Sequence, residues 1–180
     1  WSAYGQSTVV VDITSAGIPV PSTNTPTKNT SVTWTWTAVS EASTYRLKLN
    51  GERKGDNNAT SYTATNLTEG NHTFEVASID NAGNVSEYGK HILEVDLTAP
   101  PISKPSTSTP TNNPKPSWTW PSVPTAVEYF VNLYVNNTGS PQQISVGMST
   151  SFTPSENLPT GTHRVEVWSI DSVGNESIKQ

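Results

Sequence analysis

The sequence predicts an all-β protein built as two tandem antiparallel β-sandwiches, and the first reason is an internal repeat. Residues 66–85, NLTEGNHTFEVASIDNAGNV, return as residues 157–176, NLPTGTHRVEVWSIDSVGNE, with every matched pair 91 positions apart. A fixed offset over such a length indicates one structural unit copied in tandem. Identical pairs include Leu67 and Leu158, Gly70 and Gly161, His72 and His163, Val76 and Val167, Ile79 and Ile170, Asp80 and Asp171, Gly83 and Gly174, and Asn84 and Asn175.

Two further observations indicate that the repeated unit consists of short β-strands. Apolar and polar residues alternate at every second position in several stretches, which is typical of half-buried strands. Turn-forming residues recur about every 8 to 12 positions, the spacing of an all-β sandwich. No stretch shows helical periodicity over three turns. Each unit therefore has about seven short strands in about 85 to 90 residues, the pattern of an immunoglobulin-like sandwich.

The composition excludes several classes of protein. The chain has 180 residues, no cysteine and a net charge of −5. It can form neither a disulfide nor a thiolate metal site, and an acidic chain without a basic patch is a poor binder of nucleic acid. No apolar run is long enough to span a membrane, and no secretion signal begins the chain.

The domain boundaries follow from a second, shorter offset. Residues 4–12, YGQSTVVVD, match residues 88–96, YGKHILEVD, 84 positions later. We therefore assign 1–12 to the last strand of a preceding repeat or an N-terminal extension. The first repeat then covers 13–98, and the second covers 99–180 with its last strand truncated.

Within a repeat, the strands can be placed in order. Residues 13–27 are a Pro-rich linker with a weak first strand, in which proline limits pairing to an edge. Residues 31–39, SVTWTWTAV, and 44–50, TYRLKLN, alternate strictly. Asn50 and Gly51 predict a two-residue hairpin turn, because such turns need positive φ at both positions.

The second repeat is seven residues longer than the first, since the offset grows from 84 to 91. The extra residues fall mostly in 135–149, VNNTGSPQQISVGMS. Insertions concentrate in surface loops. We expect a longer hairpin with an added edge strand here.

The order of motifs resembles a known family. Each repeat has a Trp-x-Trp strand followed by a Tyr-x-Leu or Tyr-x-Val strand. The motifs Leu-x-x-Gly-x-His and Asp-x-x-Gly-Asn-x-Ser come next in both repeats, and in the first repeat they are followed by Val-Asp-x-Thr. This order is similar to that of bacterial Ig-like or fibronectin type III-like repeats, over essentially the whole chain. The resemblance implies a module of large surface proteins, adhesins or secreted polysaccharide-active enzymes. One departure is that His72 and His163 stand near the corner where fibronectin modules usually have a tyrosine.

No catalytic constellation is found. The three histidines are His72, His91 and His163, and the first and last occupy the same position of the two repeats, as structural residues do. Nucleophile elbows, phosphate-binding glycine loops and His-x-x-x-His pairs are missing from the sequence. Acidic residues are spread singly, not paired as in glycoside hydrolases. We therefore predict that the chain is not an enzyme.

Calcium at the junctions between repeats is one candidate for binding. Asp80 and Asn84 share a turn, as do Asp171 and Asn175, while Asp12 and Asp96 end the last strand of their units. In this topology Asp96 would approach the 171–175 turn, and Asp12 the 80–84 turn. Calcium prefers oxygen ligands of this kind. The alternative is that Asp-x-x-Gly-Asn is a plain turn.

Sugar binding by an exposed aromatic is the other candidate. Trp34, Trp36, Trp118 and Trp120 follow the apolar phase of their strands and are expected in the core. Trp168 is out of phase with Val165 and Val167, so we expect it to point outward, where it could cover a neighbouring loop or bind a ligand.

The sequence thus favours a non-catalytic stalk or spacer of an extracellular bacterial protein, at the cell surface or secreted, such as an adhesin. Its partners would be neighbouring repeats of the same chain, with glycan or host-surface contacts made through other domains. The alternative is an accessory module, with or without carbohydrate binding, of a secreted polysaccharide-degrading enzyme. No cofactor is required, apart from the calcium considered above.

Overall fold

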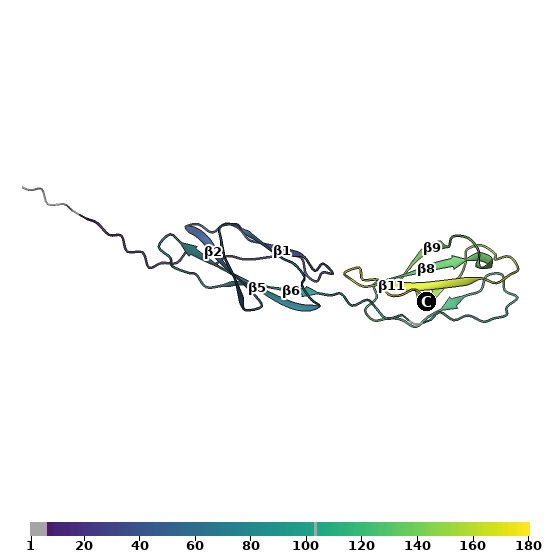
Figure 1. The fold of residues 1–180 in the computed structure, drawn as a ribbon. Helices are drawn as coiled ribbons and strands as arrows, with labels where there is room; N and C mark the ends of the chain where they lie inside the picture. Colours follow the sequence, from purple (N-terminus) through teal and green to yellow (C-terminus); the bar gives the residue numbers. More distant parts are fainter. Residues whose placement is uncertain (1–6, 103) are drawn as a thin grey trace, which may run out of the picture. The chain divides into compact units, whose positions relative to one another are not determined.

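The computed structural model describes residues 7–102 and 104–180 (Figure 1). The chain divides into two compact units, unit 1 (Trp1–Asp96) and unit 2 (Leu97–Gln180). The assignment of 1–12 to a preceding repeat stays a prediction, and its first six residues, including Trp1, lie outside the described residues.

Unit 1 is a sandwich of two antiparallel sheets. The smaller sheet pairs β1 with β4, and the larger has the order β3-β2-β5-β6. The strands are β1 (Val32–Thr35), β2 (Ala42–Leu49), β3 (Glu52–Asn57), β4 (Ser61–Ala64), β5 (Gly70–Asp80) and β6 (Gly89–Val95). Asn50 and Gly51 have φ of 53° and 79°, which confirms the predicted hairpin turn.

The proline-bearing segment before β1 contacts both sheets from their edges. Ser22 bridges Thr35 of β1, and Thr27 bridges Val95 of β6 in parallel. The Thr25–Pro26 peptide bond between these two bridges is cis, as is Thr109–Pro110 at the matching place in unit 2. Because proline lacks an N–H, pairing here is restricted to isolated bridges, as expected.

The core of unit 1 is aromatic. Trp34 and Trp36 of the first alternating stretch are 0% and 6% exposed, which confirms that they are core residues. Phe74 stacks on Trp34 with ring centres 4.9 Å apart, and Tyr62 stacks on Phe74 from the other sheet at 5.4 Å. Burial of such rings is a major source of stability for a small sandwich.

Unit 2 repeats this plan. Its sheets pair β7 with β10 and order the others as β11-β8-β9. The elements are β7 (Trp118–Thr119), β8 (Glu128–Tyr134), the 3₁₀ turn η1 (Val135–Asn137), β9 (Gln142–Gly147), β10 (Ser151–Phe152) and β11 (Arg164–Ile170). Gln180 exchanges two backbone hydrogen bonds with Val167 of β11, at 2.8 and 3.1 Å. Trp118 and Trp120 are buried, as predicted.

The seven extra residues lie mostly in the hairpin after β8. Leu49 pairs with Glu52, three positions on, whereas Leu133 pairs with Gln142, nine positions on, so this hairpin is six residues longer. The expectation of an added edge strand was wrong, however. Unit 1 has the equivalent strand, β3, which the sequence analysis missed because its charged, glycine-containing residues do not alternate.

Candidate functional site

The turn from Asp80 to Asn84 is held together by one carboxylate. Its Oδ1 accepts the backbone N–H groups of Ala82 and Asn84, both at 2.9 Å, and its Oδ2 accepts the side-chain amide of Asn84, also at 2.9 Å. The hydrogen bond from the Asn84 side chain, helped by those from the backbone, holds the pKa of Asp80 below its usual value. Gly83 has φ of 90°, a conformation that favours glycine.

Unit 2 reproduces this turn. The Asp171 carboxylate accepts N–H groups of Val173 and Asn175 at 3.0 and 2.9 Å, and the Asn175 amide at 2.9 Å. Burial raises the pKa of Asp171, but the hydrogen bonds from Asn175 and Val173 outweigh burial, and the pKa lies below its usual value. In both units, the carboxylate oxygens therefore stabilise the turn itself.

Asp12 approaches the first turn through its backbone, not its side chain. The Asn84 amide donates to the carbonyl oxygens of Asp12 at 3.1 Å and of Thr14 at 3.3 Å. The Asp12 carboxylate instead accepts the N–H of Thr14 at 3.0 Å. Asp12 and the turn from Asp80 to Asn84 therefore do lie together within unit 1, but they are joined by the Asn84 amide and backbone carbonyl oxygens, not by their carboxylates.

The junction site predicted for Asp96 stays a prediction, because Asp96 belongs to unit 1 and the Asp171–Asn175 turn to unit 2. Across residues 7–102 and 104–180, no three side chains of His, Asp or Glu converge in a way that could hold a metal ion. Within either unit, calcium would have to compete for carboxylate oxygens that already accept hydrogen bonds.

The histidines shared by the repeats close the corner before the long strand. His72 Nε2 lies 2.9 Å from the carbonyl oxygen of Thr68, and His163 Nε2 lies 2.9 Å from that of Pro159. A carbonyl only accepts, so Nε2 carries the proton in both rings. This bond to the backbone four residues upstream is the one a corner tyrosine makes in related sandwiches. The predicted corner role is therefore confirmed.

The expected exposure of Trp168 is wrong. Its side chain does lie on the outer face of the larger sheet, opposite to Val167, but only 3% of it is exposed. Phe130 of the neighbouring strand stacks on it at 5.3 Å, and the Lys179 ammonium lies 4.3 Å from its ring centre on the chain that follows β11. Trp168 is thus covered by its own unit, and a ligand could not stack on it without displacing these groups.

The sequence analysis missed the polar cluster beside Trp168. The Tyr134 hydroxyl donates to Glu166 at 2.8 Å, and Arg164 contacts Glu166 at 2.5 Å while lying 4.0 Å from the Tyr134 ring centre. Hydrogen bonding to Glu166 raises the pKa of Tyr134. Burial raises the pKa of Glu166, but bonds from Tyr134 and Asn132 reverse this effect and lower it. The sequence could have indicated this cluster, because its residues occupy the outward-facing positions of two adjacent strands.

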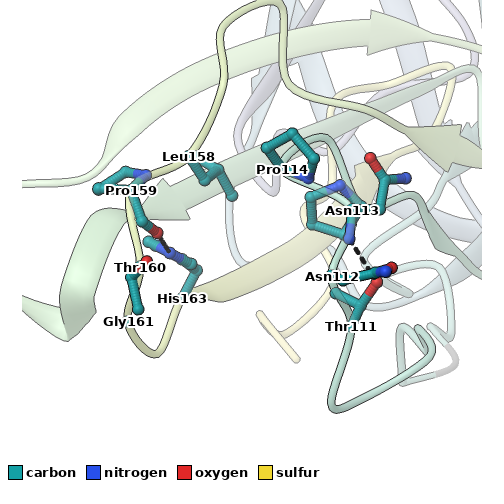
Figure 2. Close-up of a pocket in the computed structure, with 10 residues that line it drawn as sticks. Thr111, Asn112, Asn113, Pro114, Leu158, Pro159, Thr160, Gly161 and His163 are labelled. Atoms are coloured by element: carbon teal, nitrogen blue, oxygen red, sulfur yellow. Dashed lines mark hydrogen bonds between the residues drawn. The ribbon is translucent and has the colours of Figure 1, made fainter.

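Figure 2 shows a cavity of about 270 Å³ near the corner of unit 2. Its lining is Thr111, Asn112, Asn113, Pro114, Pro116, Leu158, Pro159, Thr160, Gly161 and His163. His163 is the ionisable member, and its Nδ1 accepts the backbone N–H of Asn136 at 3.2 Å while Nε2 donates to Pro159. Both ring nitrogens of His163 therefore already make hydrogen bonds to the backbone.

Several solved structures of fibronectin type III modules resemble this chain. Similar solved structures include a two fibronectin type-III domain segment from chicken tenascin (19% identity, 90% of this chain and 95% of that chain, TM-score 0.41). Others are the FN1–FN3 domains of chicken CNTN1 (12%, 91% and 64%, TM-score 0.49) and fibronectin(III)-like modules of Clostridium thermocellum CbhA (19%, 43% and 95%, TM-score 0.38).

These likenesses concern architecture alone, at identities of 12–19%. No protein-family model matches the sequence, and no curated protein is significantly similar to it. In the part of the chain that the structure describes, none of the helical segments could cross a membrane. The chain is an all-β tandem of two antiparallel β-sandwiches.

Proposed function

We propose that the two units form a non-catalytic spacer, or stalk, in a bacterial cell-surface or secreted protein such as an adhesin. The proposal rests on the observation that the residues shared by the two copies are ones that hold the fold together. Trp34 and Trp118 fill the cores, while His72 and His163 close the corners. Asp80 and Asp171 make the same three hydrogen bonds in the same turn. These shared residues thus each have a structural task.

A binding or catalytic site that belonged to the repeated unit would be repeated with it. An apolar cavity of about 460 Å³ in unit 2 is instead lined partly by Val135, Gln142 and Ile144. These residues belong to the β8–β9 hairpin, which is six residues longer than its counterpart in unit 1. The two repeats therefore share the residues that hold the fold together and differ at the surface, as expected of a spacer.

Pulling a single molecule from its two ends tests the mechanical role. Two unfolding events are expected, each releasing roughly 250–300 Å of chain, because a unit of about 84 residues extends by up to ~3.5 Å per residue. Unfolding at forces no greater than those of an isolated hairpin would contradict a load-bearing role. Hydrolysis of a polysaccharide panel by this chain would contradict the non-catalytic assignment.

Calcium would stiffen such a stalk if it bound at the junction. Thermal unfolding in EDTA and in millimolar calcium tests this, because a ligand that binds only the folded state raises stability. A rise in Tm that disappears in Asp96→Ala supports a junction site. An unchanged Tm would mean that the Asp80 and Asp171 turns bind no calcium and that the spacer works without metal.

A further inference from the structure

The chain that enters unit 1 at residues 12–17, here called the entry segment, is fixed to the unit by side chains. The Asn84 amide donates to the carbonyl oxygens of Asp12 and Thr14, at 3.1 and 3.3 Å. The Ser78 hydroxyl of β5 donates to the carbonyl oxygen of Gly17 at 2.6 Å. The entry segment belongs to no strand, so these side-chain bonds take the place of a backbone ladder.

The turn after β5 does not itself require asparagine at position 84. The Asp80 carboxylate accepts the backbone N–H of residue 84, which every residue except proline has. Gly83 has positive φ, but Asn84 does not, so asparagine is not needed there for a left-handed backbone. What its side chain adds is a pair of amide N–H groups. One donates to Asp80 Oδ2 at 2.9 Å, which leaves the other for the entry segment.

The entry segment is shaped to accept that second N–H. Asp12 Oδ1 accepts the backbone N–H of Thr14 at 3.0 Å, which closes an Asx-turn. Because this turn draws residues 12 and 14 together, both of their carbonyl oxygens reach the same amide nitrogen. Asp12 thus acts by orienting the backbone.

Both parts of this arrangement occur again in the second repeat. The Asp-x-Thr sequence of 12–14 returns at 96–98, 84 positions later, and the Asp-x-x-Gly-Asn turn returns at 171–175, 91 positions later. The Asn175 amide again donates to the carboxylate of its own turn, at 2.9 Å. Thr98 and Asn175 both belong to unit 2. The two motifs have stayed paired although seven residues were added between them.

We propose that Asn84 and Asn175 are clasps that hold the chain entering each unit, with Asn175 donating to the carbonyl oxygen of Thr98 as Asn84 donates to that of Thr14. For its purpose the clasp rests on the proposed spacer function, because a spacer keeps its length only if each unit receives the chain in a fixed direction. The clasp needs no metal, since carbonyl oxygens of the kind that bind calcium accept an amide N–H instead.

The turn prepares the amide for this role. Asp80 is only 7% exposed, and its carboxylate orients the Asn84 amide. Little side-chain freedom is then left to lose when the amide meets the carbonyl oxygens. Asp171, which is 5% exposed, orients the Asn175 amide in the same way.

Amide-proton exchange in the intact chain tests the clasp of unit 1. The reporter is the Thr14 N–H, and releasing a hydrogen bond of ordinary strength in Asn84→Ala should raise its exchange rate by roughly 2- to 10-fold. Asn71→Ala, which removes an exposed asparagine of β5, is the matched control and should leave this rate unchanged. An unchanged Thr14 rate in Asn84→Ala would overturn the proposal. An equal rise at Ala82, which donates to Asp80, would also overturn it, because the effect would then belong to the turn.

The tumbling of the two units, followed by NMR relaxation in EDTA, tests the clasp of unit 2. Asn175→Ala should let the units reorient independently, so that the rotational correlation time of each unit falls. Asn84→Ala is the matched control, because residues 12–14 do not lie between the units, and it should leave the correlation times unchanged. Units that tumble independently in the unmodified chain, or that respond equally to the two variants, contradict the clasp.

Failure of the clasp and failure of the spacer give different results. Without a clasp, the chain would still show two unfolding events when it is pulled from its ends. If instead the chain bears no load, the two Asn→Ala variants would still loosen their entry segments while the unfolding forces stay at those of an isolated hairpin.

Discussion

Unit 1 stacks aromatic rings inside the sandwich, whereas unit 2 stacks a pair of rings on the outer face of its larger sheet. In unit 1 three rings, Trp34, Phe74 and Tyr62, stack in series through the core. The counterpart of Phe74 in unit 2 is Val165, 91 positions later. Trp118 and Phe152 remain, with ring centres 6.2 Å apart.

On the outer face of the larger sheet, unit 2 has aromatic residues where unit 1 has none at the matching positions. Unit 1 pairs Arg46 with Ala77 there, and unit 2 pairs Phe130 with Trp168. The same fold therefore obtains apolar burial from either face of its larger sheet, provided that charged side chains cover the outer rings. Tandem copies can diverge in this way without changing strand order, because each face packs separately.

The largest effect is expected from truncating the core tryptophan of unit 1. Trp34→Ala should lower the stability of unit 1 by about 4–5 kcal/mol, near the upper end for such truncations, because the ring is fully buried and stacked. Trp118→Ala should cost unit 2 less. Denaturant unfolding followed by tryptophan fluorescence measures both, with the exposed Thr33→Ala as control. Equal losses in the two units would contradict the difference in core packing.

Trp168→Ala examines the outer face. We expect a loss of about 3 kcal/mol in unit 2, because a ring that is 3% exposed leaves a void under Lys179 and beside Phe130. If Trp168 were an exposed ligand platform, its truncation would leave the unfolding midpoint of unit 2 unchanged. The measurement is the denaturation midpoint of unit 2.

Trp168 also marks the limit of what the sequence could predict. Alternation correctly placed it on the outer face, but alternation describes the direction of a side chain and not what covers it. Phe130 comes from a strand 38 positions earlier in the sequence, and the covering Lys179 lies on the chain after β11. The core tryptophans, the Asn50–Gly51 turn and the histidine corners were predictable because each depends on a local pattern.

The edge strand β3 was missed for a related reason. Its residues pair with β2 through the backbone, while their charged side chains and Gly55 give no alternation of apolar and polar positions. Pairing at an edge needs only backbone groups, so side-chain periodicity does not report it. Placement of Asp12 likewise depended on its carbonyl oxygen, which carries no sequence signal.

Acid should weaken both units through the two turn aspartates. Because the pKa values of Asp80 and Asp171 are lowered in the folded state, each carboxylate contributes stability that is fully present above the ordinary aspartate pKa of ~3.9. That contribution is lost as the pH falls through the lowered, folded-state value. Asp80→Ala and Asp171→Ala should therefore flatten the acid limb of the stability curve of their own unit. An unchanged acid limb would mean that the turn does not depend on the ionised carboxylate.

A smaller effect is expected at the histidine corner. His72→Phe preserves a ring but removes the bonds to Thr68 and to the Asn50 amide, 3.0 Å from Nδ1. The loss should be about 1–2 kcal/mol, since His72 is buried and both of its hydrogen bonds are lost. His163→Phe should cost less, because that side chain is partly exposed and water can replace its bonds. Thermal unfolding of both variants checks the order, and a larger loss in unit 2 would reverse the comparison.

The smallest effect concerns the lysines that cover the outer rings. In unit 1, Lys48 of β2 lies 3.9 Å from the ring centre of Tyr88, and in unit 2 Lys179 lies 4.3 Å from that of Trp168. Tyr88 and Lys179 are matched positions, 91 apart, but their partners differ, since Lys48 lies on β2 and Trp168 lies on β11, the counterpart of β5. Lys48→Gln and Lys179→Gln should each cost about 0.5–1 kcal/mol. Lys48→Gln with Tyr88→Leu should cost less than the sum of the single changes, which a double-mutant cycle measures. Additive losses would mean that the lysines cover the rings only as hydrocarbon chains, with no contribution from their charge.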